Sequence, residues 1–300
     1  MSEITNNFLF SPSMGGGRGE AFTVIIPACN AEKHLAAAVE SVLKQSFADF
    51  ELIVVNDGST DNTRAIITSY DDKRIHLIDN PVQDRVESLN LGIKAATGHY
   101  IAFMDAESIM HVDRLKLQFA VMEAHPEITI CGSWETVFGK NTPKKILEQK
   151  VSSRVELPLI QILLDDMMIS SVFTVRRSFI EEFHLSFEHG DDAEIYKFWV
   201  DTALSGGGFY IESQPLVYRR TKETDMSRAR RLEKLESISK IKQKILPALC
   251  EKYLEKYPAL TSFYNASRAL SEQKLLSDED IFKMFHTLFM KNAEIFKNNI

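Results

Sequence analysis

The chain has 300 residues, 44% of them hydrophobic and 26% charged, which is typical of a globular protein with one large domain and an appendage, or with two small domains. Its net charge of −7 argues against a general nucleic-acid-binding surface but leaves room for a local nucleotide site that includes a metal. The three cysteines have no metal-ligand spacing, and we find neither a signal peptide nor an apolar run of the roughly 20 residues that a membrane span needs. We therefore expect a cytoplasmic protein, with peripheral contact at the inner face of the membrane as an open alternative.

Buried-type strands alternate with amphipathic helices from Phe22 onwards. Four short runs that are rich in β-branched or aromatic residues predict strands over 22–26, 51–55, 74–78 and 100–104. The stretches between them carry apolar residues at helical spacing. This alternation predicts an α/β fold with a Rossmann-like, mostly parallel sheet flanked by helices.

Three polar turns follow predicted strands: Ala28-Cys29-Asn30, Asp57-Gly58-Ser59 and Asp105-Ala106-Glu107. In parallel sheets ligands bind beyond the carboxyl ends of the strands, so we expect the three turns to gather at one ligand site. The sequence lacks a G-x-G-x-x-G motif after the first strand and lacks a G-x-x-x-x-G-K-[ST] motif throughout. These absences argue against a dinucleotide-dependent dehydrogenase and against a P-loop enzyme.

The third turn carries two carboxylates, Asp105 and Glu107, directly after an apolar run. If this segment is extended, the two side chains lie on the same face, because strand residues i and i+2 point the same way. Two adjacent carboxylates repel each other unless a positive group lies between them, and a divalent cation that carries phosphates would meet this need. The alternative is a solvated turn after a strand.

The same segments resemble family 2 glycosyltransferases of the GT-A fold. The matching segments, in order, are Val24–Glu32, Ser41–Ser46, Glu51–Thr63, Leu89–Ile93, Ala96–Ala106 and Asp113–Leu115. A looser match continues to about residue 220. The resemblance implies an inverting enzyme that moves a sugar from a nucleoside-diphosphate donor, with UDP as the expected nucleotide, to an acceptor hydroxyl. It also implies a role in the synthesis of a surface polysaccharide or glycolipid, with a saccharide or lipid-linked acceptor.

The domain organisation that we predict has three parts. Residues 1–20 form a flexible tail, and residues 21–225 form the GT-A domain. Within that domain, residues 21–120 are the half that binds the nucleotide sugar and residues 121–225 are the acceptor side. Residues 226–300 form a helical C-terminal region.

The resemblance also implies roles for the residues of the three turns. Pro27, Ala28 and Asn30 hold the nucleoside, and Asp57 pairs with the base. Ser59 lies in the same turn as Asp57 and is counted with the donor site. A second interpretation of Asp57 is a turn residue that caps its helix.

The acidic pair completes the implied donor site. Asp105 and Glu107 handle the ribose and the diphosphate-bound Mn²⁺ or Mg²⁺. Arg85 is a further candidate, because a guanidinium can bind a diphosphate bidentately. The alternative is that Arg85 is a surface charge paired with its neighbour Asp84.

Two departures from the family pattern affect the chemistry. Family members read D-A-D-D where this chain has Glu107 and Ser108, so one carboxylate is lost and another has a longer arm. The family motif E-D-Y-x-x-W places the general base at Ile195, which cannot accept a proton. Three nearby acidic residues could serve as the general base instead: Asp191, Asp192 and Glu194. Alternatively, these acidic residues only stabilise a helix N-terminus.

Beyond Arg219 the sequence predicts helices. The stretch 228–246 is basic and amphipathic, and such a helix either lies on an anionic membrane or packs its apolar stripe on its own domain. Pro247 is expected to end it, and Ser277 is expected to open the last helix with a capping box. These helices can cover the acceptor side or form a homodimer contact.

Two rival functions remain from the sequence. A degenerate glycosyltransferase fold would bind a nucleotide or a partner without transfer, as Ile195 and Ser108 suggest. A nucleotidyltransferase shares this kind of sheet, but it generally has a glycine-rich basic loop after the first strand. The segment Pro27-Ala28-Cys29-Asn30 has neither glycine nor lysine, which disfavours that reading.

Overall fold

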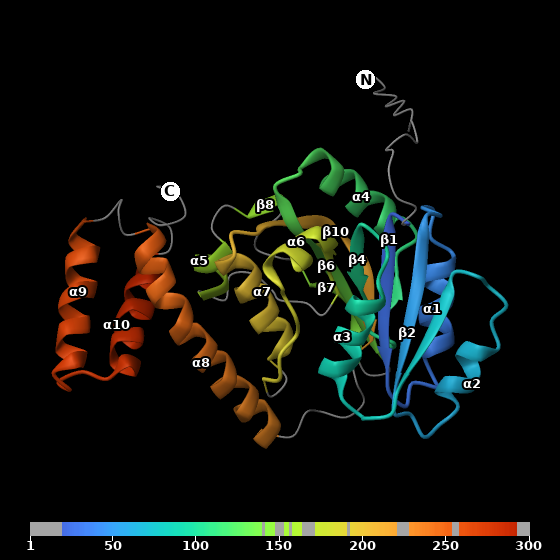
Figure 1. Ribbon diagram of the computed structural model, residues 1–300, viewed down its shortest axis with the longest axis horizontal. Helices are drawn as coiled ribbons and strands as arrows, with labels where there is room; N and C mark the ends of the chain where they lie inside the picture. The colour runs from blue at the N-terminus through green and yellow to red at the C-terminus, as the bar shows by residue number, and fades with distance from the viewer. Residues whose placement is uncertain are drawn as a thin grey trace.

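The computed structural model describes residues 20–139, 142–147, 153–155, 158–163, 172–190, 193–220, 228–253 and 258–292. Within these ranges a sheet of ten strands has helices on both faces (Figure 1). The strand order is β3-β2-β1-β4-β9-β6-β10-β5, with β7 paired to β6 and β8 to β10. The strands are β1 (Phe22–Ala28), β2 (Phe50–Asp57), β3 (Ile75–Asn80), β4 (Tyr100–Phe103), β5 (Ile109–Met110), β6 (Ile128–Gly139), β7 (Thr142–Leu147), β8 (Ser153–Val155), β9 (Thr174–Arg176) and β10 (Gly208–Arg220).

The first half of the sheet is parallel. Ile25 of β1 pairs with Ile53 of β2 and with Phe103 of β4, and β3 adds to β2 in the same direction. Antiparallel β9 then links β4 to β6, and β10 runs parallel to β6. The predicted α/β fold with a mostly parallel sheet is confirmed. The carboxyl ends of β1, β2 and β4 therefore lie along one edge.

Both faces of β1 are buried, because the strand lies between two layers of helices. Ile25 faces one hydrophobic cluster and Val24 faces the other. The first cluster contains apolar residues of α3 (Arg85–Ala95) and α7 (Glu194–Leu204), and the second those of α1 (Leu35–Leu43), α2 (Thr63–Thr68) and α4 (Arg114–Ala124). Two short helices, α5 (Pro158–Leu163) and α6 (Arg177–Phe183), lie in the second half of the chain. This burial explains why β1 is continuously apolar rather than alternating.

The C-terminal part is helical, as predicted, and consists of α8 (Arg228–Tyr253), α9 (Pro258–Glu272) and α10 (Asp278–Lys291). In Figure 1, α9 and α10 lie at the end of the molecule opposite β1 and β2. Ile245 and Leu249 of α8 and Phe285 of α10 belong to the same hydrophobic cluster as Trp199 of α7. The helical region therefore shares a core with the sheet-covering helices.

Two details of this region test the sequence predictions. The capping box at Ser277 is confirmed, since Ser277 and Asp280 exchange both of its hydrogen bonds. The prediction that Pro247 ends its helix is wrong, because α8 continues through it to Tyr253. Ile245 and Leu249 are both buried on either side of the proline, so packing holds the helix together across it.

None of the helices in the described ranges is long and apolar enough to cross a membrane. The predicted flexible tail lies outside the described residues except for Glu20. The proposed division into domains stays a prediction.

Candidate active site

The loops after β1 and β2 are joined by the side chains of two predicted site residues. The amide N–H of Asn30 donates to Ser59 Oγ at 3.0 Å, and Asn30 Oδ1 accepts the N–H of Thr60 at 2.8 Å. Ser59 Oγ in turn donates to the carbonyl oxygen of Ala28 at 3.2 Å. Asn30 adopts φ of 48°, a left-handed conformation that asparagine tolerates better than most residues. Asn30 and Ser59 thus hold the two turns against each other.

Pro27 and Ala28 are the last residues of β1, and both are buried. Pro27 does not end the strand, because β1 continues to Ala28. The exposed part of this turn begins at Cys29, whose Sγ accepts a hydrogen bond from Gln83 Nε2 at 3.0 Å.

Asp57 is only 5% exposed, and its Oδ1 accepts three hydrogen bonds. The donors are the backbone N–H of Asp84 at 2.8 Å, Ser88 Oγ at 2.9 Å and Asn80 Nδ2 at 3.2 Å. The alternative role of capping its own helix is wrong, since Asp57 instead anchors the start of α3, the next helix but one. Gly58 follows with φ of +60°, which lets the chain turn sharply after the carboxylate.

Asp84 itself caps α3, because its Oδ1 accepts the N–H groups of Val86 at 2.9 Å and Glu87 at 3.2 Å. The sequence reasoning missed this role, although an aspartate three residues before Glu87 is a recognisable N-cap pattern. Asp84 Oδ2 lies 3.3 Å from His189 Nε2, and the ion pairs of Arg85 are made with other residues.

Arg85 instead connects two acidic residues from different parts of the chain. Its Nη2 lies 2.8 Å from Asp105 Oδ1, and its Nε lies 3.4 Å from Glu194 Oε1. Burial alone would lower the pKa of Arg85, but the negative charges of Asp105 and Glu194 raise it above its ordinary value. The side chain of Glu194 is 11% exposed and that of Asp105 25%, whereas that of Arg85 is 39% exposed, so the cluster lies at the surface with its Glu194 end buried.

Asp105 and Glu107 do not lie on an extended segment. The N–H of Ser108 donates to the carbonyl oxygen of Asp105 at 3.0 Å, which closes a four-residue turn. The expectation that strand alternation places both carboxylates on one face is therefore wrong. Both residues are partly exposed, whereas Ser108 is 1% exposed and its hydroxyl has no partner within the described part of the chain.

The acidic turn offers oxygen ligands, which suit Mn²⁺ or Mg²⁺. Within the described residues, no group of three or more His, Cys, Asp or Glu side chains could hold a metal ion. Asp105 and Glu107 stay candidate ligands, and a cation held by them would need diphosphate oxygens and water as its remaining ligands, an arrangement common for Mg²⁺. Asp105 would have to share its carboxylate with Arg85.

Glu194 is the first residue of α7, where a negative charge favours the helix N-terminus. Asp191 and Asp192, the other predicted bases, lie outside the described residues. Ile195 is partly buried and packs against the hydrophobic core. Among the described residues, the candidate base Glu194 thus lies close to Asp105, with the Arg85 guanidinium between them.

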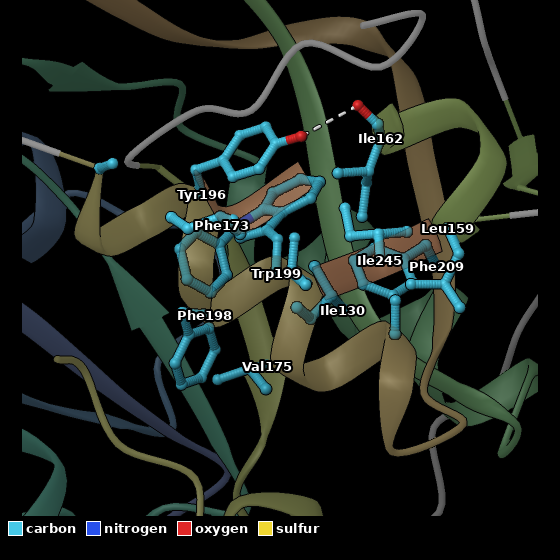
Figure 2. Packing of buried hydrophobic residues seen from close by; sticks show 14 of the residues in the cluster. Ile130, Leu159, Ile162, Phe173, Val175, Tyr196, Phe198, Trp199, Phe209 and Ile245 are labelled. Atoms are coloured by element: carbon cyan, nitrogen blue, oxygen red, sulfur yellow. Dashed lines mark hydrogen bonds between the residues drawn. The ribbon is translucent and has the colours of Figure 1, made fainter. Parts of the chain in front are cut away.

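The aromatic residues of the family motif are core residues (Figure 2). Trp199 is 1% exposed, and Tyr196 is 7% exposed and donates its hydroxyl to the carbonyl oxygen of Ile162 at 3.2 Å. Trp199 packs against Phe173 at 5.5 Å and Phe209 at 5.4 Å between ring centroids. They anchor α7 and so fix where Glu194 begins the helix.

Comparison with solved structures defines the fold class. The structure is similar to that of TarS residues 1–349 from S. aureus in complex with UDP, with a TM-score of 0.61 and 21% identity over 78% of this chain and 72% of that chain. The same protein in complex with UDP-GlcNAc gives a TM-score of 0.60 and 20% identity over 78% and 74% of the two chains. At this identity the likeness establishes the GT-A type of fold alone.

Sequence comparison establishes the family. The family model "Glycosyl transferase family 2" matches residues 23–193. The chain is 30% identical over 185 residues to the "UDP-Glc:alpha-D-GlcNAc-diphosphoundecaprenol beta-1,3-glucosyltransferase WfgD" of Escherichia coli, which covers 59% of this chain and 68% of WfgD. It is 38% identical over 124 residues to the "Putative glycosyltransferase EpsE" of Bacillus subtilis (strain 168), over 40% of this chain and 45% of EpsE. The chain belongs to glycosyltransferase family 2, and it is a glycosyltransferase, as its sequence motifs predict.

Proposed function

We propose that this glycosyltransferase moves a sugar from a UDP-sugar donor, with inversion, to a hydroxyl group of a lipid-linked or polysaccharide acceptor. The observation that carries the proposal is the position of Arg85, which contacts Asp105 at the end of β4 and Glu194 at the start of α7. A carboxylate on the donor side and a carboxylate on the acceptor side thus lie close together around one cation.

The donor side would use the edge formed by β1, β2 and β4. Asn30 and Ser59 hold the two nucleoside-facing loops together, and Asp57 fixes the end of β2 against α3. Pro27, Ala28 and Asp57 keep the donor-binding roles that the resemblance implies as predictions. The similar TarS structures in complex with UDP and with UDP-GlcNAc support a uridine nucleotide at this edge. Arg85 would place a positive charge next to the diphosphate.

Asp105 and Glu107 would hold Mn²⁺ or Mg²⁺ together with the diphosphate. When bound, the cation neutralises charge on the departing diphosphate as a Lewis acid. The chain's own contribution is to hold Asp105 on a tight turn and to supply Arg85 as a second positive group.

Glu194 would act as the general base, with Asp191 and Asp192 as the alternatives that the sequence leaves open. Oε1 of Glu194, which lies 3.4 Å from Arg85 Nε, would be the proton acceptor. It would take the proton of the acceptor hydroxyl while that oxygen bonds to the anomeric carbon. The bond between that carbon and the diphosphate oxygen breaks on the opposite side, which inverts the configuration.

The acceptor proposal is supported by the similarity to WfgD, a glucosyltransferase named for its alpha-D-GlcNAc-diphosphoundecaprenol acceptor. A lipid-linked acceptor would place the enzyme at the inner face of the membrane, with a cytoplasmic location. The N-terminal half of α8 is the surface that we propose for this contact, because Leu232 and Leu235 are 52% and 54% exposed there. A homodimer contact through the C-terminal helices stays a prediction.

The test incubates the purified protein with UDP-sugars, Mn²⁺ and a GlcNAc-diphospho-lipid acceptor, and detects the product by mass spectrometry. We expect Asp105→Ala and Glu107→Ala to abolish transfer and Glu194→Gln to reduce it strongly. Glu40→Gln on the exposed face of α1 is the matched control and should leave transfer unchanged.

A thermal-shift screen of nucleoside diphosphates with and without Mn²⁺ identifies the nucleotide independently, because a ligand that binds only the folded protein raises its melting temperature. Nucleotide binding without transfer for any donor and acceptor pair would overturn the proposed activity. Full activity of Asp105→Ala or Glu107→Ala would overturn the metal assignment.

A further inference from the structure

The side chain of Asn90 on α3 holds the backbone of Phe187, a residue 97 positions later. Asn90 Nδ2 donates to the carbonyl oxygen of Phe187 at 2.9 Å, and the N–H of Phe187 donates to Asn90 Oδ1 at 2.9 Å. One amide side chain thus satisfies both backbone polar groups of Phe187, as a residue on a neighbouring strand would. Such a reciprocal pair fixes both the position and the orientation of the peptide that it holds.

Phe187 lies between the two elements that carry the site carboxylates. Its ring meets Phe103 of β4 edge to face, with centroids 5.3 Å apart, and stacks on Phe198 of α7 at 4.5 Å. Phe103 precedes Asp105 by two residues, and Phe198 follows Glu194 by about one helical turn. Phe187 is 2% exposed, so its side chain is packed on all sides.

The helix that carries Asn90 is itself firmly seated. A Cβ atom added to Gly92 would lie 2.5 Å from Ile25 Cγ2, so α3 rests directly on β1 at this point. Asp57 holds the residue before the helix through the N–H of Asp84 at 2.8 Å. The position of Asn90 is therefore fixed by α3. If its hydrogen bonds are lost, we expect the segment around Phe187 to move rather than α3.

We propose that Asn90 is a positioning residue for sugar transfer. By fixing Phe187 between Phe103 and Phe198, it sets the start of α7, and with it Glu194, relative to Asp105. This inference rests on the proposed function of those two carboxylates. Asn90 touches no reacting group, and its effect is to keep the acceptor-side carboxylate at the right distance from the donor.

The test compares Asn90→Ala with Lys94→Ala, an exposed position one turn further along α3. We expect Asn90→Ala to lower kcat by about 10- to 100-fold, because a misplacement of about 1 Å has effects of that size. The affinity for UDP, measured by calorimetry, should change much less than kcat, since the loops after β1 and β2 are held together by their own hydrogen bonds. Asn90→Asp keeps the shape but turns a carboxylate oxygen towards the Phe187 carbonyl, so it should lose as much activity as Asn90→Ala.

A mutant cycle tests whether Asn90 acts through Glu194. In a Glu194→Gln background, adding Asn90→Ala should lower kcat by less than 3-fold, about 0.6 kcal/mol, because the group that it positions is already disabled. A full additional loss in that background would overturn the inference while leaving the proposed function standing.

Hydrogen exchange provides a readout that does not depend on activity. In the folded protein, Asn90→Ala should increase exchange in peptides that contain Phe187 and the first turn of α7, whereas Lys94→Ala should not. Unchanged exchange in Asn90→Ala overturns the inference even if no transfer is detected for the wild type. If the wild type shows no transfer but Asn90→Ala shows increased hydrogen exchange, the proposed function is contradicted and the positioning role of Asn90 is not.

Discussion

The carboxylate of Asp57 accepts the backbone N–H of Asp84 at 2.8 Å, across 27 residues of chain. This hydrogen bond joins the end of β2 to the residue that caps α3. The helix that presents Arg85 and Asn90 is thereby attached to the strand edge where the nucleotide is proposed to bind. A residue that the motif assigns to the ligand is also part of the scaffold.

Replacing Asp57 should therefore reduce stability as well as donor binding. Asp57→Ala leaves the N–H of Asp84 and the side chains of Ser88 and Asn80 without their acceptor, and we expect a loss of about 2 to 3 kcal/mol in the free energy of unfolding. Urea unfolding measures the loss, with Asp71→Ala at an exposed site as the control. Equal stability of the two variants would contradict the anchoring role.

Arg85 should not tolerate lysine. A guanidinium contacts Asp105 and Glu194 through two different nitrogens, whereas an ammonium is a single point charge. We expect Arg85→Lys to lower kcat/KM by about 10- to 100-fold, which corresponds to one lost charged hydrogen bond. Steady-state kinetics with a fixed acceptor provide the measurement. Wild-type kinetics for the lysine variant would show that the charge alone suffices.

Gly92 should not tolerate a larger side chain. Its added Cβ would approach Ile25 Cγ2 to 2.5 Å, and a β-branched core side chain has little freedom to move. Gly92→Ala should cost about 1 to 3 kcal/mol of stability, the usual range for overpacking. Gly190→Ala is the matched control, because its Cβ would find its nearest neighbour at an ordinary 3.7 Å. Thermal or urea unfolding of both variants distinguishes them.

Stability should fall in alkaline solution because of a buried thiol. Burial raises the pKa of Cys131 to about 12, while in the unfolded chain the group titrates near its ordinary value. The folded state therefore keeps a proton that the unfolded state releases. The stabilisation is complete below about pH 8.5 and is lost as the pH rises towards 12, by about 2 kcal/mol at pH 10.

Urea unfolding at pH 8 and pH 10 measures this slope. Cys131→Val removes the thiol and should flatten it, whereas Cys29→Ser, at an exposed position, should leave it unchanged. If the wild type and both variants lose the same stability between pH 8 and pH 10, groups other than Cys131 cause the loss.

The part of the fold that local patterns specify was predictable. Continuous apolar runs such as Phe22 to Ile26 encode buried strands, because burial on both faces requires them. The sequence left the conformation at Asp105 open between an extended segment and a turn, since two carboxylates after a strand are compatible with both. The helix across Pro247 depends on contacts of Ile245 and Leu249 with distant residues, which no local pattern contains.

The same limit applies to the site. The predicted sheet topology was enough to expect that the turns after β1, β2 and β4 lie together, and the family resemblance added their roles. The contact of Arg85 with Glu194 spans 109 positions, and that of Asn90 with Phe187 spans 97. Such pairs arise from how α3 and α7 pack, so periodicity and spacing do not reveal them.

The burial of Tyr196 and Trp199 separates two kinds of information in one signature. In this chain the aromatic positions of the E-D-Y-x-x-W pattern serve packing, whereas Ile195 stands at the position of its aspartate. The presence of the tyrosine and tryptophan thus indicates that the scaffold is intact and says little about reactivity. Surveys of such enzymes that sort active from inactive members should score the carboxylates around the α7 start in three dimensions rather than the aligned letters.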